Sequence, residues 1–137
     1  MARHVVGKAS ELEPGERLAT TIRGRPVVIF NLHGEYYGLL NRCPHQGAEL
    51  SKGVVGGIAV ADGPGEARCI RPGDFIRCPW HGWEFDIRTG QSWCDPGRYS
   101  IKQYQVAVER GDAIVKGPYK AEKIEVSVED DYLVVDL

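Results

Sequence analysis

Two short segments of the chain each place a cysteine and a histidine close together, beside a proline and a glycine. The first segment, CPHQG, begins at Cys43 and includes His45. The second segment, CPWHG, begins at Cys78 and includes His81. Two thiolates and two imidazoles suit either a zinc ion or an iron–sulfur cluster. The sequence therefore predicts a metal centre with these four side chains as its ligands.

The spacing within the first segment favours a cluster over a single ion. Paired ligands of one zinc ion are usually separated by two or more residues, whereas one residue separates Cys43 from His45. So short a pair fits better when its two side chains reach different metal atoms. We therefore expect a two-iron cluster, with Cys43 and Cys78 on one iron and the two histidines on the other. A protein module stabilised by structural zinc is the alternative that the residues leave open.

The turn residues of both segments agree with a buried cluster. Proline fixes φ and removes a competing backbone donor. Gly47 and Gly82 allow the backbone to approach closely, so that amide N–H groups could point at sulfide and thiolate. Such hydrogen bonds offset the negative charge of a cluster held in a dry site.

The elements that position these segments are predicted to be short β-strands. Seventeen glycines and eight prolines divide the chain into pieces, and most of the pieces are rich in the strand-favouring residues Val, Ile and Tyr. Strand-like segments on either side of a glycine-containing turn predict hairpins over 25–40 and 103–115, and a similar pattern around an acidic turn predicts one over 123–137. The one helical candidate is a turn at 10–16. The expected fold class is all-β, a small antiparallel sandwich.

Residues 51–74 interrupt this pattern, because they are rich in glycine and mostly lack alternation. We expect them to form an inserted loop or a small flap between the two Cys/His segments. The length of 137 residues suits a single domain over 1–137, with an extra C-terminal hairpin at about 123–137.

Composition excludes several classes of protein. The net charge is −2 without a basic cluster, which argues against binding to nucleic acid. No apolar run approaches the roughly 18 residues of a membrane helix, and the N-terminal residues lack the apolar stretch of a secretory signal. A cytoplasmic location is therefore expected. In that reducing compartment, cysteines grouped with histidines more often bind metal than form disulfides.

The two segments, in the context CPHQG and CPWHGWEFDIRTGQ, resemble the two cluster-binding loops of the Rieske [2Fe-2S] domain. The resemblance continues through WCDPGRYSIKQYQVAVERGDAIV and covers roughly residues 4–116, with 51–74 as an interruption. It implies a Rieske-type antiparallel β-sandwich with a small cluster-binding subdomain formed by two loops. It also implies one [2Fe-2S] cluster per chain, with the ligands Cys43, His45, Cys78 and His81.

Four further positions indicate which kind of Rieske protein the chain resembles. Ala48 and Trp80 stand where high-potential relatives carry a pair of disulfide-bonded cysteines. Trp83 and Phe85 stand where those relatives carry a serine and a tyrosine that donate hydrogen bonds to sulfur. Such bonds raise the reduction potential, so their absence implies a potential near the low end of the Rieske range, about −150 mV. The pattern is similar to the low-potential ferredoxins of ring-hydroxylating dioxygenase systems.

The histidine count separates a carrier from an oxygenase. An oxygenase needs a second iron bound by two histidines and a carboxylate, and only His4 and His33 remain. The resemblance therefore implies a one-electron carrier, not itself an enzyme, that takes electrons from a flavin-containing reductase and passes them to a terminal oxygenase. The alternative is the small subunit of a nitrite reductase-like oxidoreductase complex.

Three residues outside the ligand set carry simpler expectations. Cys69 and Cys94 do not match the disulfide positions of the family, and both are expected to be small buried side chains. Trp93 is expected to belong to the core.

Overall fold

The structure is a computed structural model of the chain. It describes residues 2–44, 47–61, 63–80, 82–93, 95–121 and 124–137. They form two compact units: Met1–Leu40 with Gln103–Leu137, and Asn41–Lys102. Antiparallel strands predominate in both units, which confirms the predicted all-β class.

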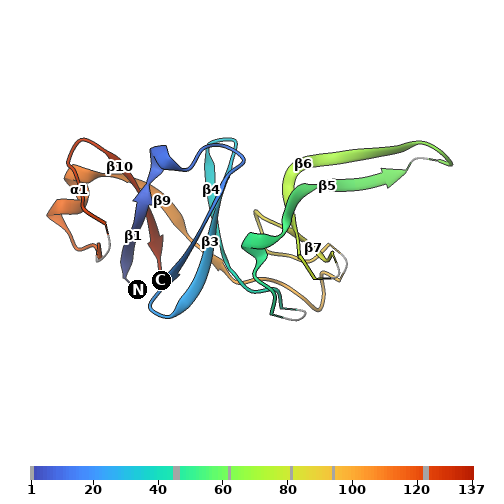
Figure 1. The fold of residues 1–137 in the computed structure, drawn as a ribbon, viewed down its shortest axis with the longest axis horizontal. Helices are drawn as coiled ribbons and strands as arrows, with labels where there is room; N and C mark the ends of the chain where they lie inside the picture. Colours follow the sequence, from blue (N-terminus) through green and yellow to red (C-terminus); the bar gives the residue numbers. More distant parts are fainter. Residues whose placement is uncertain (1, 45–46, 62, 81, 94, 122–123) are drawn as a thin grey trace. The chain divides into compact units, whose positions relative to one another are not determined.

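The first unit contains a three-stranded sheet that brings the two ends of the chain together (Figure 1). Its strands, in spatial order, are β1 (Arg3–Lys8), β10 (Asp131–Asp136) and β9 (Val106–Arg110). The central strand β10 carries four successive apolar side chains, from Tyr132 to Val135, and all four are buried. A strand that is covered on both faces is typically such a continuous apolar run.

The predicted hairpins over 103–115 and 123–137 are wrong. After β9 the chain does not return as a strand, because α1 (Gly111–Lys116) follows at once. In the described part of 123–137 the strand is β10, and its partners are β1 and β9. The alternating patterns indicated strands, but an alternating pattern does not say which strands pair.

The residues that precede β10 cover one of its side chains instead of pairing with it. The backbone N–H of Ser127 donates to the hydroxyl of Tyr132 at 2.6 Å. That hydroxyl in turn donates to the carbonyl of Glu125 at 3.3 Å. A fully buried tyrosine needs such partners for its polar end, and the segment supplies them.

The second sheet of this unit confirms the predicted hairpin over 25–40. Its strands, in spatial order, are β2 (Arg17–Ile22), β3 (Arg25–Leu32), β4 (Glu35–Leu40) and β8 (Gln103–Tyr104). His33 and Gly34 join β3 to β4 with φ values of +54° and +91°. Positive φ at both positions is what a two-residue hairpin turn requires. The predicted helical turn at 10–16 overlaps the short 3₁₀ helix η1 (Ala9–Glu11) only at its first two residues.

Side chains from both sheets share one hydrophobic cluster, so this unit is a β-sandwich. The buried members of the cluster are Leu12, Ile22, Val27, Ile29, Tyr104, Leu133 and Val135.

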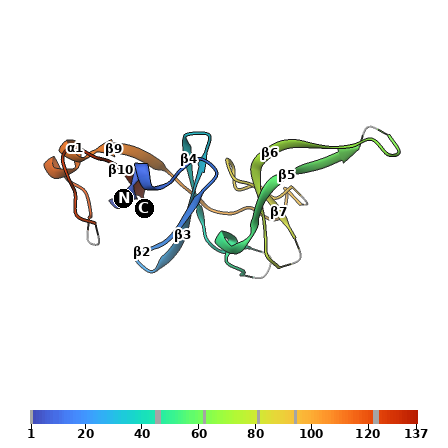
Figure 2. The ribbon, with the colours of Figure 1, turned by 45° about the horizontal axis from the view of Figure 1, so that its top comes forward.

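The second unit is built around a three-stranded antiparallel sheet in the order β5, β6, β7. Its elements are η2 (Leu50–Lys52), β5 (Val54–Ala61), β6 (Ala67–Arg77) and β7 (Glu84–Asp86). Strands β5 and β6 lie side by side as a long hairpin in both ribbon views (Figures 1 and 2). Of the two forms predicted for 51–74, the loop is therefore wrong, because most of that segment is strand, and the small flap is the form that agrees with the hairpin. That the hairpin is an insertion stays a prediction.

The hairpin is irregular near its base, where residues 71–74 of β6 oppose the single residue Gly57 of β5. A Cβ atom at Gly57 would lie 2.6 Å from Sγ of Cys69 and 3.0 Å from Cα of Pro72. Both distances are shorter than ordinary van der Waals contact, so this glycine is required by close packing.

Ion pairs connect this irregular part of β6 to β7 and to the turn after β7. Arg71 binds Asp74 at 3.1 Å and Asp86 at 2.8 Å, and Arg88 reaches Asp74 at 3.5 Å. The guanidinium of Arg71 also lies over the ring of Phe75, 4.7 Å from its centroid. The base of the hairpin is thus anchored, although most of its distal residues are exposed.

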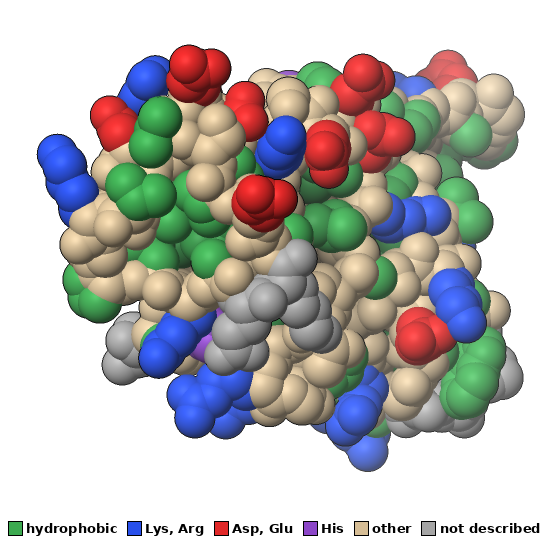
Figure 3. Space-filling view, turned by 60° about the vertical axis from the view of Figure 1, so that its left-hand side comes forward, with side chains coloured by type: hydrophobic (Ala, Val, Ile, Leu, Met, Phe, Trp, Pro, Cys, Tyr) green, Lys and Arg blue, Asp and Glu red, His purple; other side chains and the backbone are tan. Residues whose placement is uncertain are grey.

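The surface of the described residues carries both signs of charge. On the face drawn in Figure 3, acidic and basic side chains stand among apolar ones. None of the helices in the described ranges has the length and apolar character needed to cross a lipid bilayer.

The packing at Gly57 gives a test of the hairpin. We expect Gly57→Ala to lower the free energy of unfolding by about 1–3 kcal/mol, because the added methyl group overpacks a site closed by backbone and sulfur. Gly56→Ala is the matched control, since no atom lies within 4 Å of the Cβ position at the preceding glycine, and we expect its effect to stay within about 0.5 kcal/mol. Urea unfolding of both variants measures the difference. Equal losses of stability in the two variants would contradict the described register of β5 and β6.

Candidate metal centre

The first Cys/His loop connects β4 to η2 (residues 41–49) and folds around a buried cysteine. Cys43 is 1% exposed. Its backbone N–H donates to the carbonyl of Ala48 at 2.8 Å, and its carbonyl accepts from the N–H of Gly47 at 2.7 Å. Gly47 has a φ of +80°, a left-handed conformation that only glycine adopts without strain.

The second loop connects β6 to β7 (residues 78–83) and repeats this arrangement. Cys78 is 2% exposed, and its backbone N–H donates to the carbonyl of Trp83 at 2.7 Å. Gly82 has a φ of +69°. In both loops, therefore, the cysteine N–H bonds the carbonyl five residues later, and a left-handed glycine stands four residues after the cysteine.

The two loops bring their thiols together. The pKa of Cys78 is raised to about 11, chiefly because the thiol is buried, and the adjacent Cys43 thiol, which is within hydrogen-bonding reach, contributes to the rise. The backbone N–H of Trp80 bonds the Cys78 sulfur and acts in the opposite direction, because it stabilises the thiolate. Without a cation, the thiol of Cys78 therefore keeps its proton at neutral pH.

This pair fits one half of a metal site. Two buried thiols side by side become stable thiolates when a metal ion replaces their protons, and the Trp80 amide already points at one sulfur. The predicted ligands His45 and His81 lie outside the described residues, as does Cys94. Among the residues that are described, no group of three or more His, Cys, Asp or Glu side chains could hold a metal ion.

Two expectations about neighbouring residues are wrong. Cys69 is exposed, because it lies in the outer part of the β5–β6 hairpin, which no third strand covers. Trp93 is 49% exposed, because its ring packs edge-on against the outside of the buried Phe75, with centroids 5.5 Å apart.

The contact between Asn41 and Ser51 in the first loop was not predicted from the sequence. Asn41 is buried, and its side chain forms two hydrogen bonds with Ser51. The signal available in the sequence was an asparagine directly after a β-strand and before Cys43. An asparagine at such a position is more often an exposed turn residue, so its burial could be recognised only in the structure.

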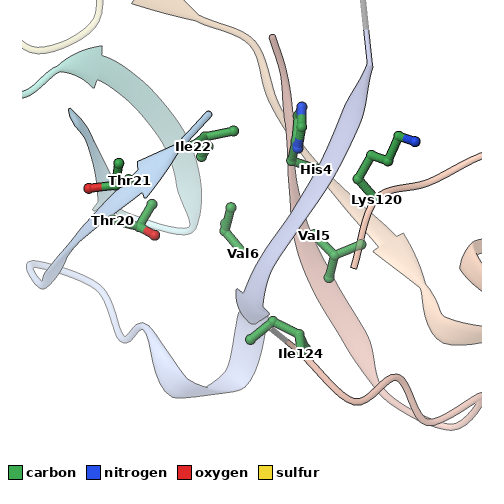
Figure 4. A pocket seen from close by; sticks show the side chains of 8 residues that line it. All are labelled: His4, Val5, Val6, Thr20, Thr21, Ile22, Lys120 and Ile124. Atoms are coloured by element: carbon green, nitrogen blue, oxygen red, sulfur yellow. The ribbon is translucent and has the colours of Figure 1, made fainter. Parts of the chain in front are cut away.

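A separate cavity of about 200 Å³ lies in the first unit (Figure 4). Strand β1 contributes His4, Val5 and Val6 to its wall, and β2 contributes residues 20–22. Lys120 and Ile124 complete the described lining. The cavity belongs to the sandwich, whereas both thiols belong to the other unit, so it forms no part of the metal centre.

The chain is similar to a known protein family and to several characterised proteins. The family model of the Rieske [2Fe-2S] domain matches residues 2–105. The ferredoxin component of the naphthalene 1,2-dioxygenase system from Pseudomonas aeruginosa is 30% identical over 99 residues, which cover 72% of this chain and 80% of that protein. Human apoptosis-inducing factor 3 is 32% identical over 111 residues. That match covers 81% of this chain but only 16% of the human protein.

Solved structures show the same fold. One similar chain belongs to a complex of reduced oxygenase and oxidized ferredoxin in carbazole 1,9a-dioxygenase. The two chains superpose with a TM-score of 0.61 and share 22% identity, over 96% of this chain and 91% of the other.

The adjacent thiols give a direct test of the centre. We expect Cys43→Ala and Cys78→Ala to lose most of their iron and acid-labile sulfide, because each removes a buried side chain that is predicted to be a ligand. Cys69→Ala is the matched control, since Cys69 is an exposed cysteine outside the thiol pair, and it should keep the wild-type content. Iron and sulfide per chain, measured on variants with wild-type circular dichroism, decide the outcome. Iron retained at the wild-type level in Cys43→Ala would remove this residue from the ligand set.

Proposed function

The chain belongs to the Rieske [2Fe-2S] domain family, and we propose that it is a one-electron carrier that takes electrons from a flavin-containing reductase and passes them to a terminal oxygenase. The observation that carries this proposal is the pair of buried, adjacent thiols presented by two loops with equivalent backbone hydrogen bonds. The similarity to a ferredoxin component of a dioxygenase system supports the choice of partners.

We propose Cys43 and Cys78 as ligands of one iron, and His45 and His81 as ligands of the other. When bound, the cluster supplies reversible one-electron chemistry at iron. The protein's contribution is to exclude water from the two thiolates, which are nearly fully buried, and to donate a backbone hydrogen bond from Trp80 to Cys78. Both loops are held by backbone hydrogen bonds, so little has to move when the charge of the centre changes.

The described surroundings support a low reduction potential. Phe85 is fully buried and has no hydroxyl, and Trp83 packs edge-to-face against Tyr99 with centroids 5.0 Å apart. Neither Phe85 nor Trp83 can donate the hydroxyl hydrogen bond to sulfur that raises the potential of high-potential Rieske centres. We therefore propose a potential of about −150 mV, near the low end of the Rieske range.

The exposed residues beside the predicted histidines form a surface on which a partner protein could dock. Pro44 and Pro79 are exposed, and Trp80 is 51% exposed although it is large and apolar. Each of these residues lies within two positions of His45 or His81. A partner protein that covers them would remove water at the point where the electron leaves.

The other candidate functions receive no support from the described residues or the comparisons. The dioxygenase ferredoxin among the relatives favours the carrier over the small subunit of a nitrite reductase-like complex. The family match favours a [2Fe-2S] cluster over structural zinc. We also propose a cytoplasmic location, supported by the free thiols of Cys43, Cys69 and Cys78, which suit a reducing compartment.

Spectroscopy and metal analysis test this function directly. We expect purified protein to be red-brown and to contain equal amounts of iron and acid-labile sulfide. One electron per chain should reduce it at low potential, and the reduced form should give an electron paramagnetic resonance signal with an average g value below that of the free electron. A colourless, folded protein with one zinc ion per chain would contradict the proposal.

Replacement of one histidine ligand tests the assignment of the outer iron. We expect His81→Cys to lower the reduction potential by on the order of 100 mV, because a thiolate adds a negative charge to a centre whose imidazole ligands otherwise raise its potential. The control is His33→Asn in the β3–β4 turn, where asparagine tolerates the positive φ, and its potential should stay at the wild-type value. Voltammetry of the two variants measures the shift. An unchanged potential in a loaded His81→Cys protein would exclude His81 as a ligand.

The pH dependence of the potential tests the same assignment without mutation. The oxidised centre carries more positive charge, so it makes the N–H of a bound imidazole more acidic than the reduced centre does. Loss of that proton stabilises the oxidised form, and the potential should therefore be constant near neutral pH and fall at alkaline pH. A potential that stays constant throughout the alkaline range would argue against exposed imidazole ligands.

A further inference from the structure

A buried asparagine closes the stem of the first loop. Asn41 directly follows β4 and is only 6% exposed. Its amide Nδ2–H donates to Oγ of Ser51 at 2.9 Å, and its Oδ1 accepts from the backbone N–H of Ser51 at 2.8 Å. The side chain thus joins the residue two positions before Cys43 to the start of η2.

The second loop is closed in a different way. Its stem is part of an antiparallel ladder, in which Arg77 directly precedes Cys78 and pairs with Glu84 of β7. The same two side chains also form an ion pair at 3.3 Å. Backbone pairing therefore fixes the distance across this stem.

The first loop lacks such a ladder in the described part of the chain. The pairs of β4 are with β3 and β8, and β4 ends at Leu40. On the other side of the loop, η2 has no side-chain cap from its own N-cap residue, Glu49. The N–H of Ser51 is one of the donors left unsatisfied at such a helix start, and Asn41 provides its acceptor.

We propose that Asn41 is the positioning residue of the first loop, and that its side-chain amide replaces the missing ladder pair and holds Cys43 in register with the second loop. The inference rests on the proposed [2Fe-2S] function. Asparagine suits the task because its short planar side chain offers both a donor and an acceptor. Leucine offers neither, and ionised aspartate offers acceptors only.

The consequence for the centre follows from its two-loop construction. A cluster held by ligands from both loops needs a fixed separation between them. If the stem of the first loop opens, Cys43 can move away from Cys78, water can enter, and the molecules no longer share one ligand geometry. Partners that orient metal ligands commonly contribute 10–100-fold to metal affinity.

The chain offers a matched control in Asn31. It is also a buried asparagine, 2% exposed, with two side-chain hydrogen bonds. Its Nδ2–H donates to the carbonyl of Leu12 at 2.8 Å, and its Oδ1 accepts from the N–H of Gly34 at 2.8 Å. Asn31 belongs to the other compact unit. Asn31→Ala therefore measures how much stability is lost with any buried, hydrogen-bonded asparagine.

The experiment compares Asn41→Ala, Ser51→Ala and Asn31→Ala with the wild type, each loaded with its cluster. We expect Asn41→Ala to lose iron to a chelator about 10-fold faster, and the paramagnetic resonance lines of its reduced form to broaden. Ser51→Ala keeps the hydrogen bond from its backbone N–H to Asn41. Its rate of iron loss and its line width should therefore lie between those of Asn41→Ala and the wild type. Asn31→Ala should match the wild type in both measurements, even where its melting temperature is lower.

Hydrogen exchange on the cluster-free full chain supplies a second readout that needs no iron. The amide of Ser51 should exchange faster in Asn41→Ala than in the wild type and at the wild-type rate in Asn31→Ala. Wild-type iron loss and unchanged resonance lines in Asn41→Ala would overturn the proposal, as would an equal loss in Asn31→Ala. A wild type without iron would overturn the function itself, and Ser51 exchange would then still show whether Asn41 closes the loop.

Discussion

The metal centre depends on one electrostatic constraint: two thiols, at Cys43 and Cys78, are buried side by side. Burial and the neighbouring sulfur both disfavour the thiolate of Cys78, and they raise the pKa of this residue to about 11. A bound cation reverses this preference, because it supplies the charge that burial removes. The hydrogen bonds of the two loops keep both sulfur atoms in place. The backbone N–H of Trp80 adds a partial positive charge next to the sulfur of Cys78.

The repeated loop geometry explains why the Cys/His segments were recognisable in the sequence. Each segment encodes a turn locally: proline after the cysteine, and a left-handed glycine four positions after it. The hairpin over 25–40 was predictable for the same reason, because His33 and Gly34 suit a two-residue turn. Where a few adjacent residues determine the backbone, the sequence alone was sufficient.

The errors share a physical cause, since each depended on contacts between segments far apart in the chain. Strand β10 was predicted from its alternating pattern. Its pairing with β1 and β9, however, depends on the burial of its four apolar side chains. Segment 51–74 was predicted to be a loop or a small flap because of its glycines, yet Gly57 is there because Cys69 and Pro72 pack against it. Asn41 was missed because its partner, Ser51, lies on the far side of the loop.

The long β5–β6 hairpin between the two Cys/His segments is compatible with a rigid centre because its base is anchored independently of its length. At its base, Arg71 and Arg88 bind the carboxylates of Asp74 and Asp86, and the ladder of β6 with β7 continues up to Cys78. Extra length beyond such an anchor adds exposed strand, and the entropy of closing a connection grows only slowly with its length. The spacing between the two proposed ligand pairs is therefore a poor measure of how tightly the centre is held. The better measures are the stems of the two loops.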